Sequence, residues 1–452
     1  MSAPTHDLGY ARAVHALGER GRFGVRLGLG RTRALLRELG DPQLAVHGAL
    51  IAGTNGKGSV LALADAALRA AGHHVATTPK PHLVSYRERI AVDGRPIGAD
   101  DFARLVNRVL DVSDQVAHRQ GQPTEFELLT AVVFAHFAEV RPDVALVEVG
   151  LGGRLDATHA WDGGVAVVTN VDLDHTDRLG PTITAIAREK AAIIERGDLA
   201  VTGAHGDGLA VIRRRARRLG VPLTEVEPAP LLGWDRDGID VDLPGLGRTR
   251  VGLRGRHQAA NVAIADALLD ALAAAGIAAT PPSARRAGYG AAVWPGRLEL
   301  IRVADRDVLL DGAHNPAGAT ALAVALDDLR PYLANGPITL VTASMSDKDV
   351  DGVVGALAAA RALGGATVVC TSLPVPRAMP AADLAARWRS GLPGSRVLVE
   401  ADPLAALDRA LSNPSSEPGP IVVAGSLYLV GAARGRLVDD PDLRDPEPSE
   451  DA

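Results

Sequence analysis

Residues 53–59 contain three glycines and one lysine. They follow an apolar run at 46–52 and lead into a segment, 58–71, whose apolar residues recur at helical spacing. In a strand–loop–helix unit, glycines let backbone N–H groups approach a polyphosphate, and the helix N-terminus adds partial positive charge. Lys57 adds a full positive charge, and the Ser59 hydroxyl suits Mg²⁺ or a phosphate oxygen. The sequence therefore predicts a phosphate-binding loop made of Gly53, Thr54, Asn55, Gly56, Lys57, Gly58 and Ser59.

The match to the usual phosphate-binding pattern G-x-x-x-x-G-K-[ST] is imperfect. The first glycine would fall at Ile51, and Gly58 stands where serine or threonine is expected. The alternative is a glycine turn with an exposed lysine. The order of strand, loop, lysine and helix favours phosphate binding over that alternative.

An acidic residue in an apolar strand is a second candidate. Glu148 lies near the end of the run 143–149, and α/β sheets bind ligands at the carboxyl ends of their strands. A buried carboxylate is costly unless it is paired or bound to a metal, so a Mg²⁺ ligand and a structural salt bridge are both open. Asp172, Asp174 and His175 follow the next predicted strand, 165–169, and are candidates to lie beside it.

A lysine lies on the apolar face of the predicted helix 182–194. Ile183, Ile186 and Ile194 mark that face, and Lys190 falls on it at helical spacing. Burial removes hydration from an ammonium group and lowers its pKa. From spacing alone, two outcomes are open: the ammonium extends to water, or the neutral amine reacts with CO₂ to form a carbamate that suits Mg²⁺.

Short apolar strands alternate with helical stretches throughout the chain, which predicts a doubly wound α/β fold. A second series of strands is expected at 308–310, 338–342, 367–371 and 421–424. Proline and glycine at 294–297 place a boundary near 290–298. We therefore expect a domain at 1–293 that contains the phosphate loop, a smaller Rossmann-like α/β domain at 298–438, and a disordered acidic tail at 439–452.

The composition narrows the class of protein. Lys and Arg total 48 against 54 Asp and Glu, and aromatic residues make up 3%, which argues against a nucleic-acid partner bound through bulk charge. A single cysteine, Cys370, cannot form an intrachain disulfide and is expected to be a small buried residue. With no apolar stretch long enough for a membrane span and no signal peptide, we expect a cytoplasmic protein without a membrane partner.

Taken together, these residues resemble the folylpolyglutamate synthase/dihydrofolate synthase family, within the Mur-type ATP-dependent amide ligases. The similarity covers nearly the whole chain, and the order and spacing of its blocks carry it. The blocks are GLGRTRALLRELGDPQ (28–43), GTNGKGS (53–59), PHLVSYRERI (81–90), TEFELLT (124–130), VEVGLGGRLDAT (147–158), NVDLDHTDRLGPTITAIAREKAAI (170–193), LRGRHQAAN (253–261), WPGRLE (294–299), LDGAHNP (310–316), DKD (347–349) and GSLYLVG (425–431).

The resemblance implies a role for each matching residue. Lys190 matches a position that is carbamylated in the family, which favours the carbamate over an exposed ammonium. The implied ATP contacts are the loop 53–59, Asn261, Arg297 and Asp311, the last two from the second domain. The implied metal ligands are Ser59, Glu148, His175 and Lys190, and the implied catalytic residues are Lys57, Lys190 and His314.

The resemblance also implies a pterin–benzoate pocket, and the chain departs from the family pattern near it. The usual T-S-P-H-L reads TPKPHL here, so Lys80 replaces a serine that helps to bind Mg²⁺; the usual D-A-T-N ends in His159. An ammonium cannot ligate a cation, so Lys80 is assigned to a phosphate or a substrate carboxylate. The implied substrate-binding residues are Lys80, His82, Thr124, Glu125, Phe126, Glu127, Leu155, Asp156 and Ala157.

The expected activity is ATP- and Mg²⁺-dependent ligation of L-glutamate to dihydropteroate, to a reduced folate, or to both, by a monomer that binds only small molecules. ATP would convert the acceptor carboxylate to an acyl phosphate, which the glutamate amine attacks, and closure of two domains would exclude water. Two alternatives remain: another Mur-type ligase acting on a peptidoglycan precursor, and an ATP-binding protein in which Lys80 has disabled the metal site.

Overall fold

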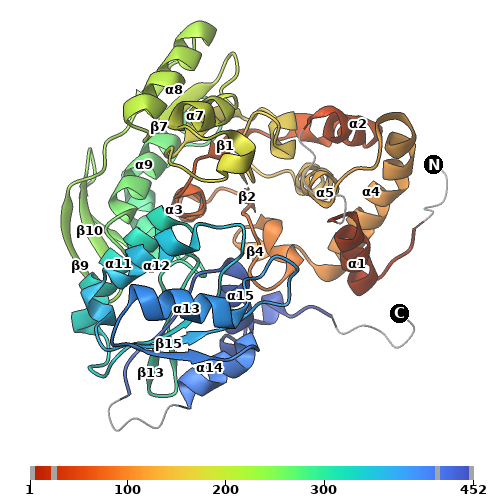
Figure 1. The fold of residues 1–452 in the computed structure, drawn as a ribbon. Coiled ribbons are helices and arrows are strands. Elements are labelled where there is room, and N and C mark those ends of the chain that lie inside the picture. Colours follow the sequence, from red (N-terminus) through yellow and green to blue (C-terminus); the bar gives the residue numbers. More distant parts are fainter. Residues whose placement is uncertain (1–5, 22–27, 413–417, 447–452) are drawn as a thin grey trace. The chain divides into compact units, whose positions relative to one another are not determined.

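The computed structural model describes residues 6–21, 28–412 and 418–446 (Figure 1). The chain forms two compact units. Unit 1 consists of Met1–Pro228, Ala260–Tyr289 and Pro441–Ala452, and unit 2 of Ala229–Ala259 and Gly290–Asp440. The crossing at Tyr289 and Gly290 lies at the edge of the boundary predicted near 290–298, but the predicted first domain, 1–293, also contained the segment Ala229–Ala259, which belongs to unit 2.

Unit 1 is built on an eight-stranded sheet in the order β4-β3-β2-β5-β1-β6-β7-β8. The strands from β2 to β8 in this order run parallel, and β3 and β4 are antiparallel additions at one edge. Their bounds are β1 (Gly48–Ala52), β2 (Val75–Thr78), β3 (Ala91–Val92), β4 (Arg95–Pro96), β5 (Val144–Glu148), β6 (Gly164–Val168), β7 (Leu199–Thr202) and β8 (Leu223–Glu225). The predicted strands at 46–52, 143–149 and 165–169 are thus confirmed as β1, β5 and β6.

The helices of unit 1 cover this sheet. α3 is buried on nearly every side because it is rich in alanine and leucine, as expected for a helix that packs inside a domain. α1, α2, α4 and α5 contact one another and bury Leu17, Leu35, Phe102 and Phe134 (Figure 1). The bounds are α1 (Tyr10–Gly21), α2 (Gly30–Glu38), η1 (Pro42–Ala45), α3 (Lys57–Ala70), η2 (Tyr86–Arg89), α4 (Ala99–Gln120), α5 (Glu125–Val140), η3 (Ala157–Ala160), α6 (Thr176–Leu179), α7 (Ile183–Ala191), α8 (Gly206–Leu219), α9 (Gln258–Ala274) and α10 (Pro282–Ala291).

Unit 2 contains a six-stranded sheet in the order β12-β13-β17-β14-β15-β16, with β12 antiparallel to β13 and the rest parallel. All four strands predicted for the second series are present, and Cys370 is buried in β15. The bounds are β12 (Glu299–Val303), β13 (Arg306–Asp311), α11 (Pro316–Leu329), η4 (Arg330–Tyr332), β14 (Thr339–Thr342), α12 (Val350–Ala358), η5 (Arg361–Leu363), β15 (Thr367–Cys370), α13 (Ala381–Gly391), β16 (Arg396–Val399), α14 (Pro403–Leu411), β17 (Ile421–Ala424) and α15 (Leu427–Leu437).

The segment Ala229–Ala259, which the predicted domain 1–293 included and which groups with unit 2, contains a small antiparallel sheet, β11-β10-β9. It comprises β9 (Leu231–Asp235), β10 (Gly238–Leu243) and β11 (Gly247–Val251). Two ion pairs tie this part of the chain to the rest of unit 2: Arg236 with Asp307, whose side chain is buried, and Arg256 with Asp328 through two hydrogen bonds of 2.6 Å. Such long-range pairs leave no signal in the local pattern, so the sequence did not reveal them.

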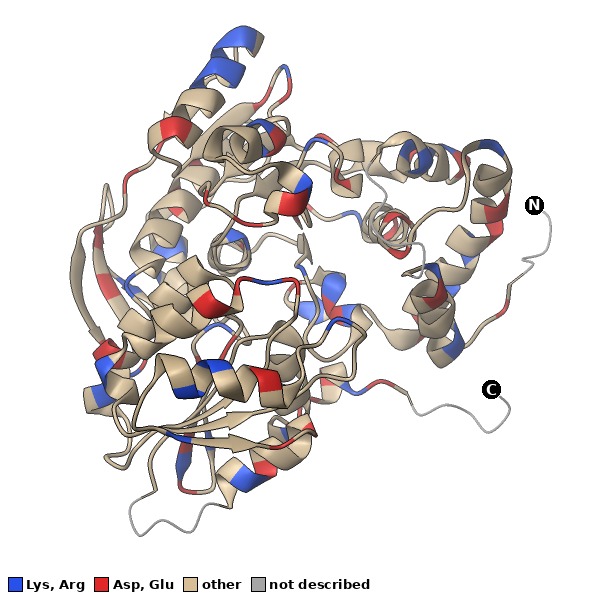
Figure 2. Ribbon diagram, viewed as in Figure 1, with Lys and Arg blue, Asp and Glu red and all other residues tan. Residues whose placement is uncertain are grey.

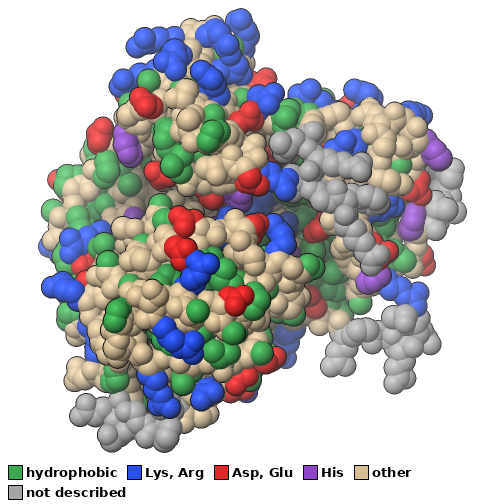
Figure 3. Space-filling view, viewed as in Figure 1, with side chains coloured by type: hydrophobic (Ala, Val, Ile, Leu, Met, Phe, Trp, Pro, Cys, Tyr) green, Lys and Arg blue, Asp and Glu red, His purple; other side chains and the backbone are tan. Residues whose placement is uncertain are grey.

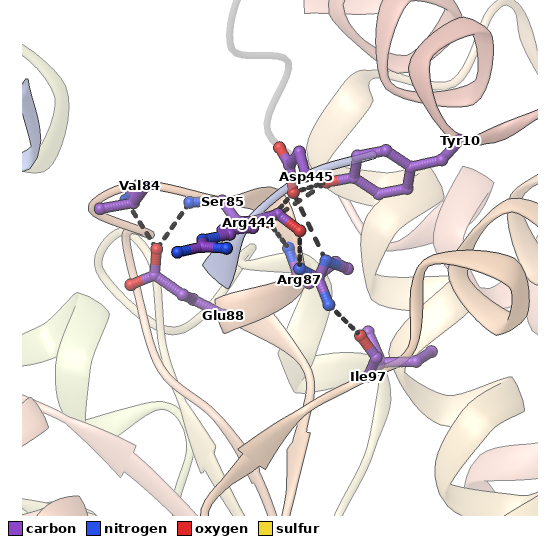
Figure 4. A network of polar contacts seen from close by, with 8 residues as sticks. All are labelled: Tyr10, Val84, Ser85, Arg87, Glu88, Ile97, Arg444 and Asp445. Carbon is purple, nitrogen blue, oxygen red and sulfur yellow. Dashed lines mark hydrogen bonds and ion pairs between the residues drawn. The ribbon is translucent and has the colours of Figure 1, made fainter. Parts of the chain in front are cut away.

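The acidic tail predicted as disordered at 439–452 is ordered where the structure describes it. Pro441–Leu443 form η6 with Leu443 buried, and the Asp445 carboxylate accepts hydrogen bonds from Tyr10 and Ser85 (Figure 4). An apolar anchor and several donors for the acid hold the segment in place. The prediction for residues 447–452 lies outside the described residues.

Charged residues of both signs are spread over the structure, apart from a concentration of arginine on α8 (Figures 2 and 3). That helix carries Arg213, Arg214, Arg215, Arg217 and Arg218. Across the part of the chain that is described, every helix is too short or too polar to traverse a lipid bilayer.

Candidate active site

The glycine loop connects the end of β1 to the first turn of α3, as the sequence predicted. Gly53 and Gly56 have φ angles of +155° and +81°, a region that favours glycine. A Cβ at position 53 would overlap the Thr169 hydroxyl, and one at position 56 would overlap Oδ1 of Asn261. The loop therefore requires glycine at both positions, and its folding brings Asn261, a predicted ATP contact, beside it.

The loop is held by residues that the sequence did not single out. The Asn170 side-chain oxygen accepts hydrogen bonds from the backbone N–H groups of Thr54 (3.1 Å) and Asn55 (2.9 Å). The Thr169 hydroxyl donates to the carbonyl of Asn55 at 2.6 Å. Both residues follow β6 directly, and their position at the end of a parallel strand was the signal that could have identified them.

Lys57 is the first residue of α3, and its ammonium group lies over the loop. Nζ donates to the carbonyl oxygens of Gly53 (3.1 Å) and Thr54 (3.2 Å). Ser59 is buried in the same first turn of the helix. A lysine charge, a helix N-terminus and loop amides thus lie within one short segment, which is the arrangement that binds phosphate.

Glu148 is the last residue of β5 and is only 4% exposed. Its Cα is paired with Ile51 in the neighbouring strand β1, two residues before the loop begins. The backbone N–H of Lys80 donates to its carboxylate Oε2 at 2.9 Å. The sheet register therefore brings a buried carboxylate to the same edge as the phosphate-binding loop.

Lys190 lies in α7 and is buried, which excludes the extension of its ammonium group to water. Burial lowers the pKa of Lys190 to about 7, and the charge of Lys57 lowers it further, while Asp174 and Asp172 oppose the shift. The Lys190 amine is therefore close enough to Lys57, Asp172 and Asp174 for their charges to act on it.

His175 is the N-cap residue of α6 and has a left-handed backbone, φ +49°, and its side chain is 43% exposed. Its Nε2 lies 3.8 Å from the carboxylate of Asp174. Among the described residues, no three or more His, Cys, Asp or Glu side chains are arranged to hold a metal. The predicted metal ligands besides Glu148 and His175 are a hydroxyl and a modified lysine, which are of other types.

The two blocks predicted to form the acceptor pocket meet at Gly150. A Cβ there would lie 3.0 Å from the Phe126 ring and 3.2 Å from the Asp156 carboxylate. Phe126 lies in the first turn of α5, whose N-cap Thr124 forms a capping box with Glu127. Asp156 is buried, caps η3 and accepts from the N–H of Leu151 at 2.8 Å, while Ala157 is buried beside it and Leu155 is half-buried.

Two further hydrogen bonds fix the acids of this region. Arg31 donates through Nε to Glu127 at 2.9 Å, and the Tyr86 hydroxyl donates to Glu125 at 2.8 Å. Arg31 and Tyr86 lie in blocks GLGRTRALLRELGDPQ and PHLVSYRERI, but the sequence did not assign them a role. The structure therefore links three blocks that are far apart in the chain.

His82 is held as a neutral ring. Its Nδ1 accepts from Nε of Arg89 at 2.8 Å, and its ring lies 4.3 Å from that of Tyr86. Burial, with a further contribution from the Arg89 charge, lowers the pKa of His82 to about 3. His159, the other departure from the family pattern, is buried and contacts the Arg154 carbonyl and the Glu195 carboxylate.

The side chain of Lys80 is partly buried. Nζ donates to the backbone carbonyl of Glu148 at 2.7 Å and lies 4.5 Å from the centre of the Phe126 ring. Burial lowers the pKa of Lys80 to about 8, and the Asp156 and Glu148 carboxylates oppose the shift. In this structure the ammonium group contacts protein groups, and its contact with a phosphate or a substrate carboxylate stays a prediction.

The remaining predicted residues gather within unit 2. Asp311 ends β13, is buried, and accepts from the N–H groups of Leu298 and Ala313 at 2.9 Å each. Burial raises the pKa of Asp311, against the effect of the Arg297 charge. His314 follows in the next loop, where its Nδ1 lies 2.8 Å from the Gly312 carbonyl. A Cβ at Gly312 would lie 2.6 Å from Nη1 of Arg297, so these residues form one cluster.

Comparison with known proteins identifies the family. The Mur ligase middle domain matches residues 51–223, and the Mur ligase glutamate ligase domain matches 296–427. The chain is 34% identical to the dihydrofolate synthase/folylpolyglutamate synthase of Bacillus subtilis over 433 residues, which cover 92% of this chain and 96% of that protein.

Solved structures agree with this result. Mycobacterium tuberculosis folylpolyglutamate synthase, complexed with ADP and AMPPCP, has a TM-score of 0.84 at 34% identity and covers 96% of this chain and 99% of its own. A bifunctional enzyme of Yersinia pestis, complexed with AMPPNP and a Mn ion, has a TM-score of 0.79 at 28% identity, with coverage of 96% and 100%. The chain belongs to the folylpolyglutamate synthase/dihydrofolate synthase family of Mur ligases.

Proposed function

We propose that the protein is an ADP-forming ligase that joins L-glutamate to dihydropteroate, to a reduced folate, or to both. The observation that carries this function is the grouping of Lys57, Glu148 and Lys190 around one glycine loop, in a chain of this family. Phe126 and Asp156, which meet at Gly150, supply an aromatic face and an acid for a pterin-type acceptor.

The reaction requires two steps because a carboxylate has a poor leaving group. An oxygen of the acceptor carboxylate attacks the γ-phosphorus of ATP, and the bond to ADP breaks. The amine of glutamate then attacks the acyl carbon, phosphate leaves with the electron pair of the broken bond, and the nitrogen loses a proton to form the amide. Lys57 and the amides of the first turn of α3 offset the charge on the transferred phosphoryl group.

Magnesium suits the donor set at the edge of the sheet. Glu148 offers a buried carboxylate beside the loop, and Ser59 offers a hydroxyl. Mg²⁺ is usually held by one or two protein ligands together with substrate phosphates, so a small donor set is sufficient. When bound, the ion supplies positive charge to the phosphate oxygens. We assign Glu148, Ser59, His175 and a modified Lys190 to this role.

The buried Lys190 amine supports a carbamate. A pKa of about 7 leaves a large neutral fraction near neutral pH, and the neutral nitrogen can add to CO₂ with loss of one proton. Lys190→Ala should abolish turnover, and a small carboxylic acid such as acetate should restore part of it by standing in for the carbamate. Absence of any rescue, with a folded variant, would argue against the modification.

The cluster in unit 2 is assigned to ATP. Arg297 and Asp311 lie in the blocks WPGRLE and LDGAHNP, and His314 follows two residues after a glycine that packs on Arg297. We expect Arg297→Ala to raise KM for ATP at least about tenfold, since an arginine–phosphate contact is a strong charge-assisted one.

Release of ADP from the purified protein tests the function. Dihydropteroate and tetrahydrofolate are offered in turn, with and without L-glutamate. We expect glutamate-dependent ADP release with at least one acceptor, from a protein that is monomeric by light scattering. No glutamate-dependent release with either acceptor would overturn the assignment.

One observation favours a second candidate, an ATP-binding protein that does not ligate. The Lys80 ammonium lies beside Glu148, where a further metal ligand would otherwise be useful. Tight ATP binding without turnover, together with turnover in Lys80→Ser, would support that candidate. Glutamate-dependent turnover of the wild type would exclude it.

A further inference from the structure

Lys80 joins three elements of unit 1 at the edge of the sheet. It follows β2, donates through its backbone N–H and its ammonium group to the terminal residue of β5, and covers the ring of Phe126 in α5. The two contacts with Glu148 differ: the backbone N–H meets the carboxylate at 2.9 Å, whereas Nζ meets the main-chain carbonyl at 2.7 Å. The side chain is therefore fixed at both ends.

The positive charge of Lys80 is partly buried among charged groups of both signs. The groups that act on it electrostatically are the acids Asp156 and Glu148 and the cations Arg89 and Lys57. An ammonium has three N–H donors and no lone pair, so it cannot ligate a metal. It can, however, weaken the attraction of a second cation to the same carboxylate, because Coulomb interactions between partly buried groups are stronger than in bulk water.

We propose that Lys80 is a positioning residue that orients Glu148 and lowers its affinity for a free divalent cation, so that the metal binds together with the nucleotide. The inference rests on the proposed role of Glu148 as a metal ligand. It gives Lys80 a function in this chain other than a substrate contact. With the ammonium in place, the phosphates of ATP must supply the additional negative charge that holds the ion.

Binding of Mn²⁺ alone to the nucleotide-free full chain tests the proposal, with free Mn²⁺ measured by electron paramagnetic resonance. Lys80→Met removes the charge and keeps most of the stem over Phe126. Lys80→Gln also removes the charge but can still donate to the Glu148 carbonyl. Lys80→Arg keeps the charge. We expect both neutral variants to bind Mn²⁺ on the order of tenfold more tightly than the wild type, as for one unit charge at close range.

The same experiment contains its controls. Lys80→Arg should bind Mn²⁺ within about threefold of the wild type, since its charge is retained. Adding Glu148→Gln to either neutral variant should remove the gain, which places the gain at that carboxylate. A merely structural role of Lys80 would predict equal or weaker binding in the neutral variants.

Two results would overturn the inference. In one, neither neutral variant binds Mn²⁺ more tightly than the wild type; if one of them fails to fold, by circular dichroism, the other decides. In the other, the gain persists after Glu148→Gln. Failure of the proposed function is seen separately, as absence of glutamate-dependent ADP release from the wild type.

Discussion

Gly56 and Asn261 lie so close together that a Cβ on the first would overlap the side-chain oxygen of the second. The contact joins the phosphate-binding loop to α9, which is distant in sequence. Because Gly56 also has a φ of +81°, both its backbone and its surroundings exclude other residues.

Gly56→Ala should therefore displace the loop and lower kcat/KM for ATP at least about tenfold, since small misplacements of reacting groups are costly. Gly72→Ala is the matched control: its φ is +89°, but nothing lies within 4 Å of the added Cβ. The control should lose about 1 kcal/mol of stability and keep its kcat/KM for ATP. Wild-type kinetics in Gly56→Ala would contradict the structural account of the loop.

The pKa of Lys190 predicts how stability depends on pH. The folded state releases the proton near pH 7, whereas an unfolded lysine keeps it to about 10.4. Between these values the unfolded state binds more protons, so raising the pH favours the folded state.

Relative to Lys190→Met, the wild type should gain on the order of 2–4 kcal/mol in free energy of unfolding between pH 7 and 10. Urea denaturation in CO₂-free buffer measures this, because carbamate formation would add a second effect. If the free energy of unfolding changed equally with pH in the two proteins, the amine of Lys190 would not be buried as described.

The ring of His82 should remain neutral between pH 5 and 8, because its pKa is held at about 3 by burial and by Arg89. NMR of protein labelled with ¹³C-histidine should show no titration of this ring. The signal of His82 is assigned by its absence in His82→Gln. Arg89→Met should raise the pKa of His82 and increase KM for the acceptor, since Arg89 and Tyr86 fix the ring. Titration of His82 near pH 6.5 in the wild type would contradict the prediction.

Asp445 connects the C-terminal segment to α1 and η2 (Figure 4). Its Oδ1 accepts from the hydroxyls of Tyr10 at 2.8 Å and Ser85 at 2.6 Å. Asp445→Ala should lower the free energy of unfolding by about 1 kcal/mol, a modest effect because the acid is partly exposed. In a double-mutant cycle by urea denaturation, Tyr10→Phe and Asp445→Ala should be less than additive; strict additivity would show that the contact does not form.

The sequence predicted those features of the structure that depend on residues close together in the chain, and missed those that depend on residues far apart in it. The loop 53–59 was predictable because glycines, a lysine and flanking periodic segments are neighbours in the chain. Helical spacing placed Lys190 on the apolar face of its helix but left open whether its ammonium group extends to water. The surroundings of Lys80 could not be predicted, since its partners Glu148 and Phe126 are set by the register of two strands and the start of a distant helix.

The acidic tail illustrates the same limit. Its composition predicts disorder, but Leu443 is buried and Asp445 accepts a hydrogen bond from Tyr10, near the other end of the chain. The grouping of the sheet β9–β11 with unit 2 was likewise not predictable, because the pairing of Arg236 with Asp307 leaves no signal in the local sequence pattern.

The chain returns to unit 1 at Pro441, and this affects the order in which the protein folds during its synthesis. A growing polypeptide folds from its N-terminus as it leaves the ribosome. Tyr10, Ser85 and Arg87 emerge early, yet their acidic partner is made only after all of unit 2. Unit 1 is therefore the first to begin folding and the last to be completed. A truncated translation product that ends before residue 441 would contain unit 1 without the contacts that Asp445 makes with Tyr10 and Ser85.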